Sequence, residues 1–374
     1  MRFADIPGSE IVRKNLIRSA KAGKVAHALL FMGSEGALNL PLALAYITYL
    51  HCENKEEQDA CGTCAACRKS LKYIHPDTHF VFPMGNLKGD QDEDRFKAET
   101  LKTWRAFLLD QPFGNLHNWV NFYGGEDKQI NISREESRSI IKALSLKPFE
   151  SPYKIMLIWQ PEYMHPSAAN GILKILEEPP PHTFFLLVTN AAETLLPTIL
   201  SRTQILNVPL LTDEELNDYL SRYTDADELK RKKIVQLAEG NLNLALDLLD
   251  TEEDHNQEQF TDWMRACFKK DYSKLLGLSE DYHALDKLSQ RNLLQYGLAM
   301  MREALLLQSG ATSISRVKGG ELKFIQDFSK VLDVAKIERS SRLIGEAEYH
   351  VERNGSAKMI FLDLSIQLAK IINP

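Results

Sequence analysis

Residues 27–50 read HALLFMGSEGALNLPLALAYITYL, an apolar run, a glycine turn and a second, longer apolar segment. This order predicts a buried strand, a turn and a helix, which is the setting of a phosphate-binding loop. A working loop has the form G-x-x-x-x-G-K-[ST], so a match from Gly33 would end in glycine, lysine and a hydroxyl residue. The chain has Leu38, Asn39 and Leu40 at those three positions. The stretch therefore predicts the frame of a nucleotide site without its usual chemistry.

A phosphate loop needs glycines that let N–H groups wrap the phosphates, a lysine that neutralises them and a hydroxyl that holds magnesium. Gly33 and Gly36 supply the first part, and the other two parts are absent. Because a charge-assisted hydrogen bond contributes roughly 1.5–3 kcal/mol, loss of the lysine alone should weaken phosphate binding by about one to two orders of magnitude. Leu40 has no oxygen with which to bind magnesium.

A second apolar run is IMLI at 155–158. In a working site, an acidic pair that holds magnesium and water would follow this run directly. The next two residues are Trp159 and Gln160. Neither is an anion, and a tryptophan would occupy the space that a metal ion needs. Two catalytic elements are thus missing at their expected positions while both strand frames are intact. We interpret the chain as a scaffold that kept its fold and lost hydrolysis.

Length and composition place these motifs in an ordinary globular protein. The chain has 374 residues, 44% of them hydrophobic and 26% charged, which is typical of two or three folded domains. Its net charge of −6 gives no global basic field for nucleic acid. The first fifteen residues lack the apolar core of a secretion signal, and the longest apolar run, 40–50, is too short to span a bilayer. We therefore expect a cytoplasmic protein with no membrane contact.

The fold class follows from where apolar runs and helical patterns lie. Near-continuous apolar runs at 27–33, 153–159 and 183–190 are typical of central strands in a parallel sheet. The pattern after Pro209 is helical. We therefore predict an α/β domain followed by two helical domains, with the second boundary in the charged stretch TEEDHNQE. The predicted domains are residues 1–208, 209–255 and 256–374.

Residues 84–130 are less regular than the rest of the α/β part. They contain a charged stretch and then a predicted helix that includes Trp104. A polar aromatic loop is expected around Trp119 and Tyr123. After this region, a helix is expected over 132–148, where Ser133 would cap its start with Glu three residues on.

Four cysteines lie within sixteen residues in the spacing C-x8-C-x2-C-x2-C: Cys52, Cys61, Cys64 and Cys67. Four converging thiolates suit a closed, tetrahedral structural zinc site with no open catalytic position. Paired disulfides are the first alternative, which a reducing cytoplasm disfavours, and free thiols or a redox pair are the others. His51, His75 and His79 are nearby ligand candidates, although ordinary core or loop roles fit them better. Cys267, the fifth cysteine, is expected to be a buried apolar residue.

Several motifs follow one another in an order that resembles bacterial clamp-loader subunits. They are the frame HALLFMGSEG, the four cysteines, HPDTHFV, SLKPFESPYKIMLI, AANGILKILEEPPPHTFFLLVTN and LPTILSRTQIL. These subunits belong to the AAA+ group, and include delta-prime of DNA polymerase III and its ATPase relatives gamma and tau. The match covers about 1–82 and 130–210 well. Residues 84–130 depart from the family pattern as an insertion.

The resemblance favours the delta-prime type. Gamma-like subunits keep the lysine and acidic motifs, whereas delta-prime subunits often lack them but retain the zinc module and a Ser-Arg pair, here Ser201 and Arg202. In this family the arginine projects into the ATP site of the next subunit, where a guanidinium stabilises charge on the γ phosphate. Thr203 stands where the family often has cysteine. The alternative for Arg202 is a structural ion pair at a helix end.

The resemblance also implies a hetero-oligomeric ring with gamma or tau and delta, which places the sliding clamp on primed DNA using ATP bound by the neighbours. The C-terminal helices of 256–374 would form a collar that holds the ring together, and 209–255 would form a helical lid. Asn190 would be a remnant of the strand end that senses γ phosphate, and Asn243 stands near the place of a lid arginine. Zinc is then the expected cofactor, and ATP is not expected to be hydrolysed by this chain.

Two other functions remain open from the residues. One is an active ATPase of the gamma type, against which positions 38–40 and 159–160 count. The other is a zinc-containing DNA-binding protein outside any ring. Lys174 and the basic run 230–233 could contact phosphate backbone, but solvated surface positions fit them better.

Overall fold

The computed structural model describes residues 1–85, 93–125, 130–133, 140, 143–144, 147–249, 253–285, 287–311, 319–352 and 355–373. The chain divides into two compact units. The first contains residues 1–231 and 238–243, and the second contains 232–237 and 244–374. The predicted three-domain division remains a prediction, and each unit is described here by itself.

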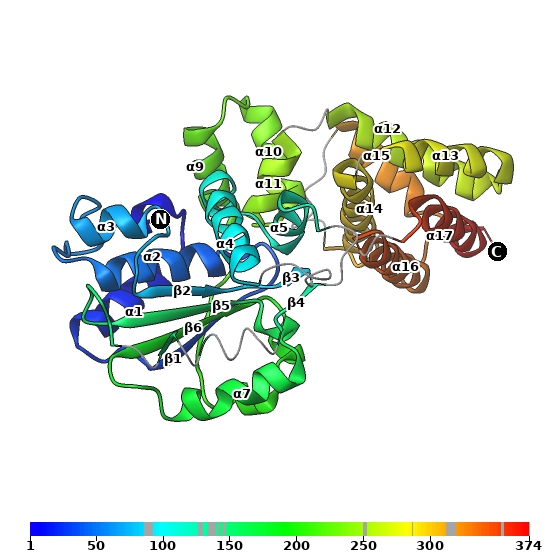
Figure 1. Ribbon diagram of the computed structural model, residues 1–374. Coiled ribbons are helices and arrows are strands. Elements are labelled where there is room, and N and C mark those ends of the chain that lie inside the picture. Colours follow the sequence, from blue (N-terminus) through cyan, green and yellow to red (C-terminus); the bar gives the residue numbers. More distant parts are fainter. Residues whose placement is uncertain are drawn as a thin grey trace. The chain divides into compact units, whose positions relative to one another are not determined.

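A five-stranded parallel sheet forms the centre of the first unit (Figure 1). Its order is β2-β5-β6-β1-β7, and every pairing between neighbours is parallel. The strands are β1 (Ala28–Met32), β2 (Thr78–Val81), β5 (Lys154–Trp159), β6 (Thr183–Thr189) and β7 (Gln204–Asn207). This confirms the predicted α/β class with its buried central strands. β7 was not predicted, because an edge strand that exposes most of its residues shows no apolar run.

The pleat of the strands divides their apolar side chains between two faces. Leu30, Ile158 and Leu187 pack with helix α7 (Pro166–Glu177) in one core cluster. The alternate residues point to the opposite face, which helix α2 (Asn39–His51) covers (Figure 1). Every residue of α2 is buried, which explains why its sequence is apolar on all sides. Other helical elements of the α/β part are η1 (Phe3–Asp5), α1 (Glu10–Lys21), α3 (Ala65–Ser70), η2 (Pro161–Tyr163), η3 (Ala192–Thr194) and α8 (Pro197–Leu200).

In its described residues, the inserted region forms two helices and a small antiparallel pair of strands. They are β3 (Met84–Gly85), α4 (Glu93–Asp110), α5 (Leu116–Phe122) and β4 (Ile130–Asn131). The expected loop around Trp119 is wrong, because Trp119 lies in α5 and is completely buried. Asn115 caps α5 through reciprocal hydrogen bonds with Asn118. The helix predicted over 132–148 falls mostly on residues outside those described.

The helical character predicted after Pro209 is confirmed in the described part of the chain. Three helices follow the sheet: α9 (Asp213–Tyr223), α10 (Glu228–Ala238) and α11 (Leu242–Leu249). A capping box of Thr212 and Glu215 starts α9. The described residues after these form six more helices: α12 (Glu253–Lys269), α13 (Tyr272–Ala284), α14 (Lys287–Gln308), α15 (Gly319–Phe328), α16 (Val334–Glu352) and α17 (Ala357–Ile372). The stretch TEEDHNQE, expected as a linker, is helical from Glu253 onward.

The second unit has its own aromatic core. Phe361 stacks on Tyr282 and packs against Trp263, with ring centroids 4.2 Å and 4.5 Å away. The indole N–H of Trp263 donates to Ser365 Oγ at 2.8 Å. Cys267 is fully buried in this cluster, as predicted for the fifth cysteine.

Candidate functional site

Three polar strand ends meet at the carboxyl edge of the parallel sheet, where α/β proteins bind their ligands. The glycine loop follows β1, Gln160 follows β5 and Asn190 follows β6. These strands are adjacent in the sheet order, so their ends lie side by side. The structure thus places at this edge the residues that the sequence analysis assigned to a degenerate nucleotide site: Gly33, Gly36, Asn39, Trp159, Gln160 and Asn190.

The amide of Asn190 ties the loop to the strand ends. Its Nδ2 donates to the carbonyl oxygen of Ser34 at 2.8 Å and lies 3.4 Å from that of Gly33. Its Oδ1 accepts a hydrogen bond from Gln160 Nε2 at 2.9 Å. Gln160 has a left-handed backbone (φ 55°), which turns the chain after β5. Neutral amides therefore bind the loop at the place where an active site would bring charged groups.

Asn39 stands where the template has its lysine and is almost fully buried. Its Nδ2 donates to the carbonyl oxygen of Thr189 at 2.8 Å, so the side chain is bound to the end of β6. A Cβ atom added to Gly33 would lie only 2.5 Å from Asn39 Oδ1. At Gly36, with φ +85°, an added Cβ would lie 2.1 Å from Cγ of Asn241. Both glycines are therefore needed for close packing within the unit, independently of any phosphate.

Trp159 lies inside an aromatic cluster and not in an open site. Its side chain is 2% exposed, and its ring centroid is 4.9 Å from that of Trp104. Trp104 in turn packs edge-on against Trp119 and stacks on Phe82. Trp119 donates its indole N–H to the carbonyl of Pro83 at 2.8 Å. The position that an acidic metal ligand would occupy is therefore filled by apolar packing.

One carboxyl group near the loop escaped the sequence analysis. Glu162 Oε2 accepts a hydrogen bond from the hydroxyl of Thr189 at 3.0 Å. Burial raises the pKa of Glu162 to about 7, while the hydrogen bonds to its carboxylate oppose the rise. Glu162 lies two positions after 159–160, where the acidic pair was expected. Its only signal in the sequence is this place shortly after a buried strand. Its contact with Thr189 makes it part of the strand-end network.

Arg202 lies just after α8 and is held by groups of its own chain. Its Nη1 donates to the carbonyl of Thr198 at 2.9 Å, and its Nη2 forms an ion pair with Glu177 at the end of α7. Ser201 is close, with its Oγ 3.4 Å from Nη1. The side chains of Arg202 and Glu177 are 27% and 50% exposed, so solvent reaches both. In the chain alone, Arg202 therefore makes the helix-end ion pair that was the alternative to a finger.

The four cysteines converge as their spacing predicted. Their sulfur atoms all lie within 4.8 Å of one another, with Cys52 3.6 Å and Cys67 3.9 Å from Cys61. Zinc–sulfur bonds of about 2.3 Å in a tetrahedron put ligand sulfurs about 3.8 Å apart, whereas a disulfide needs about 2.05 Å. Backbone N–H groups of Cys61, Cys64 and Cys67 point to cluster sulfurs at 3.3–3.4 Å. The arrangement fits zinc and does not fit disulfides.

The nearby histidines have other partners. His51 Nδ1 is 2.7 Å from Ser151 Oγ, and its Nε2 is 2.9 Å from Thr78 Oγ1. His51 also stacks on His75, and burial lowers the pKa of His51 to about 3. Among the described residues, the metal-sized group contains the four cysteines alone. The core interpretation of His51 and His75 fits these contacts, and His79 is likewise outside the group.

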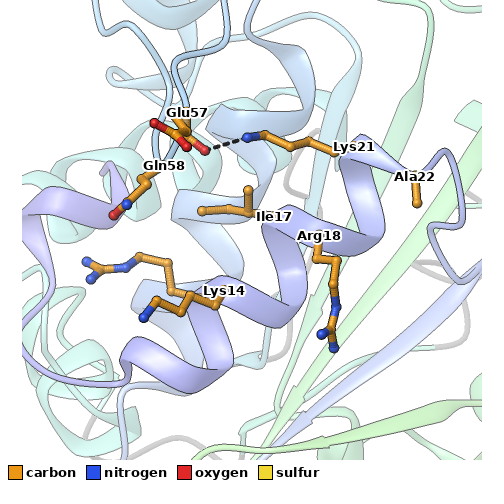
Figure 2. Close-up of a pocket in the computed structure, with 8 residues that line it drawn as sticks. Lys14, Ile17, Arg18, Lys21, Ala22, Glu57 and Gln58 are labelled. Atoms are coloured by element: carbon orange, nitrogen blue, oxygen red, sulfur yellow. Dashed lines mark hydrogen bonds between the residues drawn. The ribbon is translucent and has the colours of Figure 1, made fainter.

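A surface groove of about 450 Å³ lies between α1 and the cysteine loop (Figure 2). The side chain of Lys21 reaches across the groove, and its Nζ donates to the carbonyl of Glu57 at 2.7 Å. Lys14 forms an ion pair with Glu10, and Arg18 donates to Asn15. These cations are engaged within α1 or across to the loop. The groove was not anticipated from the sequence, and its residues are separate from the strand-end network.

Comparison with known proteins assigns the family. A family model described as DNA polymerase III, delta subunit, matches residues 8–212, more than half of the chain. The chain belongs to this delta-prime family. The matched residues contain the cysteine cluster, Arg202 and the glycine loop after β1, which Asn190 binds and which we call the closed loop. The assignment confirms the resemblance seen in the motifs.

More distant relatives are subunits tau and gamma of DNA polymerase III. The tau subunit of Bacillus subtilis is 25% identical over 67% of this chain and 37% of its own length. The gamma subunit of Buchnera aphidicola is 24% identical over 66% of this chain and 58% of its own. The chain thus spans between about a third and three-fifths of these relatives.

A solved gamma subunit-related protein from Thermotoga maritima aligns over 96% of this chain and 99% of its own, with 14% identity and a TM-score of 0.41. None of the described helices has the length and hydropathy of a membrane span.

Proposed function

We propose that this delta-prime family member is a non-catalytic subunit of the DNA polymerase III clamp loader. In this proposal it neither holds nor hydrolyses ATP. The closed loop is the observation that carries the proposal. Asn190, Gln160 and Asn39 bind the loop and the strand ends to each other with neutral amides. A triphosphate would have to displace these amides, and the position-39 lysine and position-40 hydroxyl that would compensate are absent.

We propose that Arg202 acts on the ATP site of a neighbouring subunit. To do so it has to leave Glu177. An ion pair between solvent-exposed groups contributes about 0–1 kcal/mol, and this pair is partly exposed on both sides. A γ phosphate in a site shielded from water offers stronger, charge-assisted hydrogen bonds. The ion pair is therefore weak enough to be exchanged when a neighbour docks.

The four cysteines are proposed to hold a structural zinc ion that fastens the start of the chain. Asp59 lies between Cys52 and Cys61 in the sequence. Its carboxylate accepts hydrogen bonds from the backbone N–H groups of Phe3 and Ala4 at 3.1 Å and 2.9 Å. When bound, the metal would fix the cysteine loop and so fix these contacts. No catalytic role is proposed for it, because four protein sulfurs leave no open position.

The proposed partners are gamma or tau, delta, the sliding clamp and, through the assembled complex, primed DNA. Reconstitution with purified gamma and delta subunits, scored for loading of the clamp, tests the proposal. We expect a stable complex and clamp loading that depends on this chain. Failure to assemble would favour the zinc-containing DNA-binding protein outside a ring.

ATP titration of the isolated chain separates the proposal from an active gamma-type ATPase. We expect no magnesium-dependent binding at micromolar ATP. Binding in that range, together with turnover by the isolated chain, would overturn the non-catalytic assignment.

A further inference from the structure

The inserted region contacts four separate points around the closed loop. Two of them lie on the α/β layer. The side chain of Asn115 donates to Glu35 Oε1 of the loop at 3.1 Å. Trp104 packs against Trp159 at the end of β5. Figure 1 shows α4 between the sheet and α9, with α5 beside α4. The insertion thus reaches the loop and the second strand end, which are the two places where a phosphate loop site would hold phosphate and metal.

The other two contacts reach the segment that covers the loop. Phe113 packs edge-on against Tyr219 of α9, with ring centroids 5.7 Å apart. Asn118 Oδ1 accepts a hydrogen bond from Asn243 Nδ2 at 3.0 Å. We call α9 together with residues 238–243 the lid segment. Its two parts are joined, because Leu211 N, just before α9, donates to the carbonyl of Gly240 at 3.3 Å.

We propose that residues 104–119 of the insertion act as a built-in substitute for the nucleotide, holding the loop, the end of β5 and the lid segment in one arrangement. The proposal rests on the proposed non-catalytic function. A bound nucleotide in a phosphate loop site links such parts only while it is bound. Here the link is part of the same chain, so the lid segment stays in contact with the loop region without any ligand.

The insertion has a buried aromatic part and a partly exposed part that makes the outward contacts, and this arrangement supports the role. Trp104, Phe107 and Trp119 are fully buried and anchor the insertion on Trp159. The contacts that reach outward are polar or partly exposed and lie at the turn and start of α5. An apolar anchor with polar tips fixes the position of the lid segment without adding charge to the loop. Asn241, from the same segment, also packs directly over Gly36.

The test removes the lid contacts and leaves the anchor in place. The variant Phe113→Ala/Asn243→Ala in the full chain deletes both contacts without touching the aromatic cluster or the cap of α5. Asn118 is kept because it belongs to that cap. A matched control, Phe149→Ala/Asn121→Ala, removes the same side-chain types at exposed positions. Hydrogen–deuterium exchange of the α9 amides is the measurement, with tryptophan fluorescence to show that the anchor is intact.

We expect exchange in α9 to rise about tenfold or more in the test variant and to stay unchanged in the control. Unchanged exchange in the test variant would overturn the proposal. If the double variant fails to fold, Phe113→Ala alone gives the same readout at Tyr219 and its neighbours. Magnesium ATP added to the wild-type chain should leave α9 exchange unchanged. Protection by ATP would overturn the proposed function, whereas the variant comparison alone decides the role of the insertion.

Discussion

Arg202 and Glu177 are the two ends of one ion pair, and the proposed function predicts that removing either end has a different effect. Glu177→Gln removes only the ion pair within the chain. Because such a partly exposed pair contributes about 0–1 kcal/mol, we expect stability to change by no more than that. At the neighbouring ATP site the change should be at most about fivefold, since 1.4 kcal/mol corresponds to a factor of ten.

Arg202→Ala removes the same ion pair and the proposed finger together. Because Arg202 also donates to the carbonyl of Thr198, its removal should lower the stability of the isolated chain by no more than about 1.5 kcal/mol beyond the effect of Glu177→Gln. Its effect on ATP hydrolysis should be much larger, because a trans-acting arginine contributes about 10³–10⁵ in rate in well-studied phosphate-transfer sites. The single arginine serves a single site, so the burst of hydrolysis in the reconstituted complex should lose one ATP per complex.

The assay is a pre-steady-state burst of phosphate release with clamp and primed DNA, alongside urea unfolding of each isolated variant. Arg222→Ala is the matched control, since Arg222 forms an exposed ion pair with Asp218 on α9 at 2.8 Å. Equal burst amplitudes for Arg202→Ala and Glu177→Gln would show that Arg202 is only a structural ion pair. The reasoning about the finger would then be refuted, while the family assignment would stand.

Three further predictions concern the structural parts of the site. Chelation of zinc from the isolated chain should increase hydrogen exchange at the amides of Phe3 and Ala4, because Asp59 of the cysteine loop accepts their hydrogen bonds. Unchanged exchange after verified metal loss would contradict the proposed role. Trp119→Ala should lower the free energy of unfolding in urea by about 3–5 kcal/mol, whereas Phe149→Ala, at an 81% exposed position, should change it little. Burial raises the pKa of Glu162 from 4.5 to about 7, so its protonated form favours the fold and its contribution is lost as pH rises through this window. Glu162→Gln should therefore make unfolding free energy less dependent on pH between 4.5 and 7, and a pH profile identical to wild type would argue against this.

The sequence predicted those parts of the site that depend on neighbours along the chain. Four closely spaced cysteines converge because a short loop and the start of α3 bring them together. The buried strands were visible as apolar runs, and parallel pairing then places their carboxyl ends at one edge. The strand β7 was missed because it exposes most of its residues. The helix α5 was missed because its seven residues bury only Trp119.

What closes the loop could not be predicted, because the partners of amide side chains depend on tertiary structure. Asn190 contacts Ser34, which lies far away in the sequence, and Asn118 meets Asn243 from another helix. Asparagine in a sequence indicates turns and caps more often than it indicates such long-range contacts. The insertion had no interpretation from its residues for the same reason. The insertion is anchored on Trp159 through Trp104. From the sequence, Trp159 showed only that the expected acidic residue was absent.

The replacement of charges by amides has a consequence for how the subunit behaves in a ring. In a site with an acidic pair, the two carboxylates repel each other until a metal ion is bound, so bound nucleotide and metal add to the stability of such a site. Gln160 and Asn190 instead hydrogen-bond to each other, Asn190 donates to the loop carbonyl of Ser34, and Asn39 donates to the carbonyl of Thr189 at the end of β6. We therefore expect the loop to keep the same arrangement with and without ATP. In the proposed function, such a subunit would present Arg202 from a fixed framework, and Arg202 would exchange its weak ion pair with Glu177 and its hydrogen bond to the carbonyl of Thr198 for contacts with the neighbour.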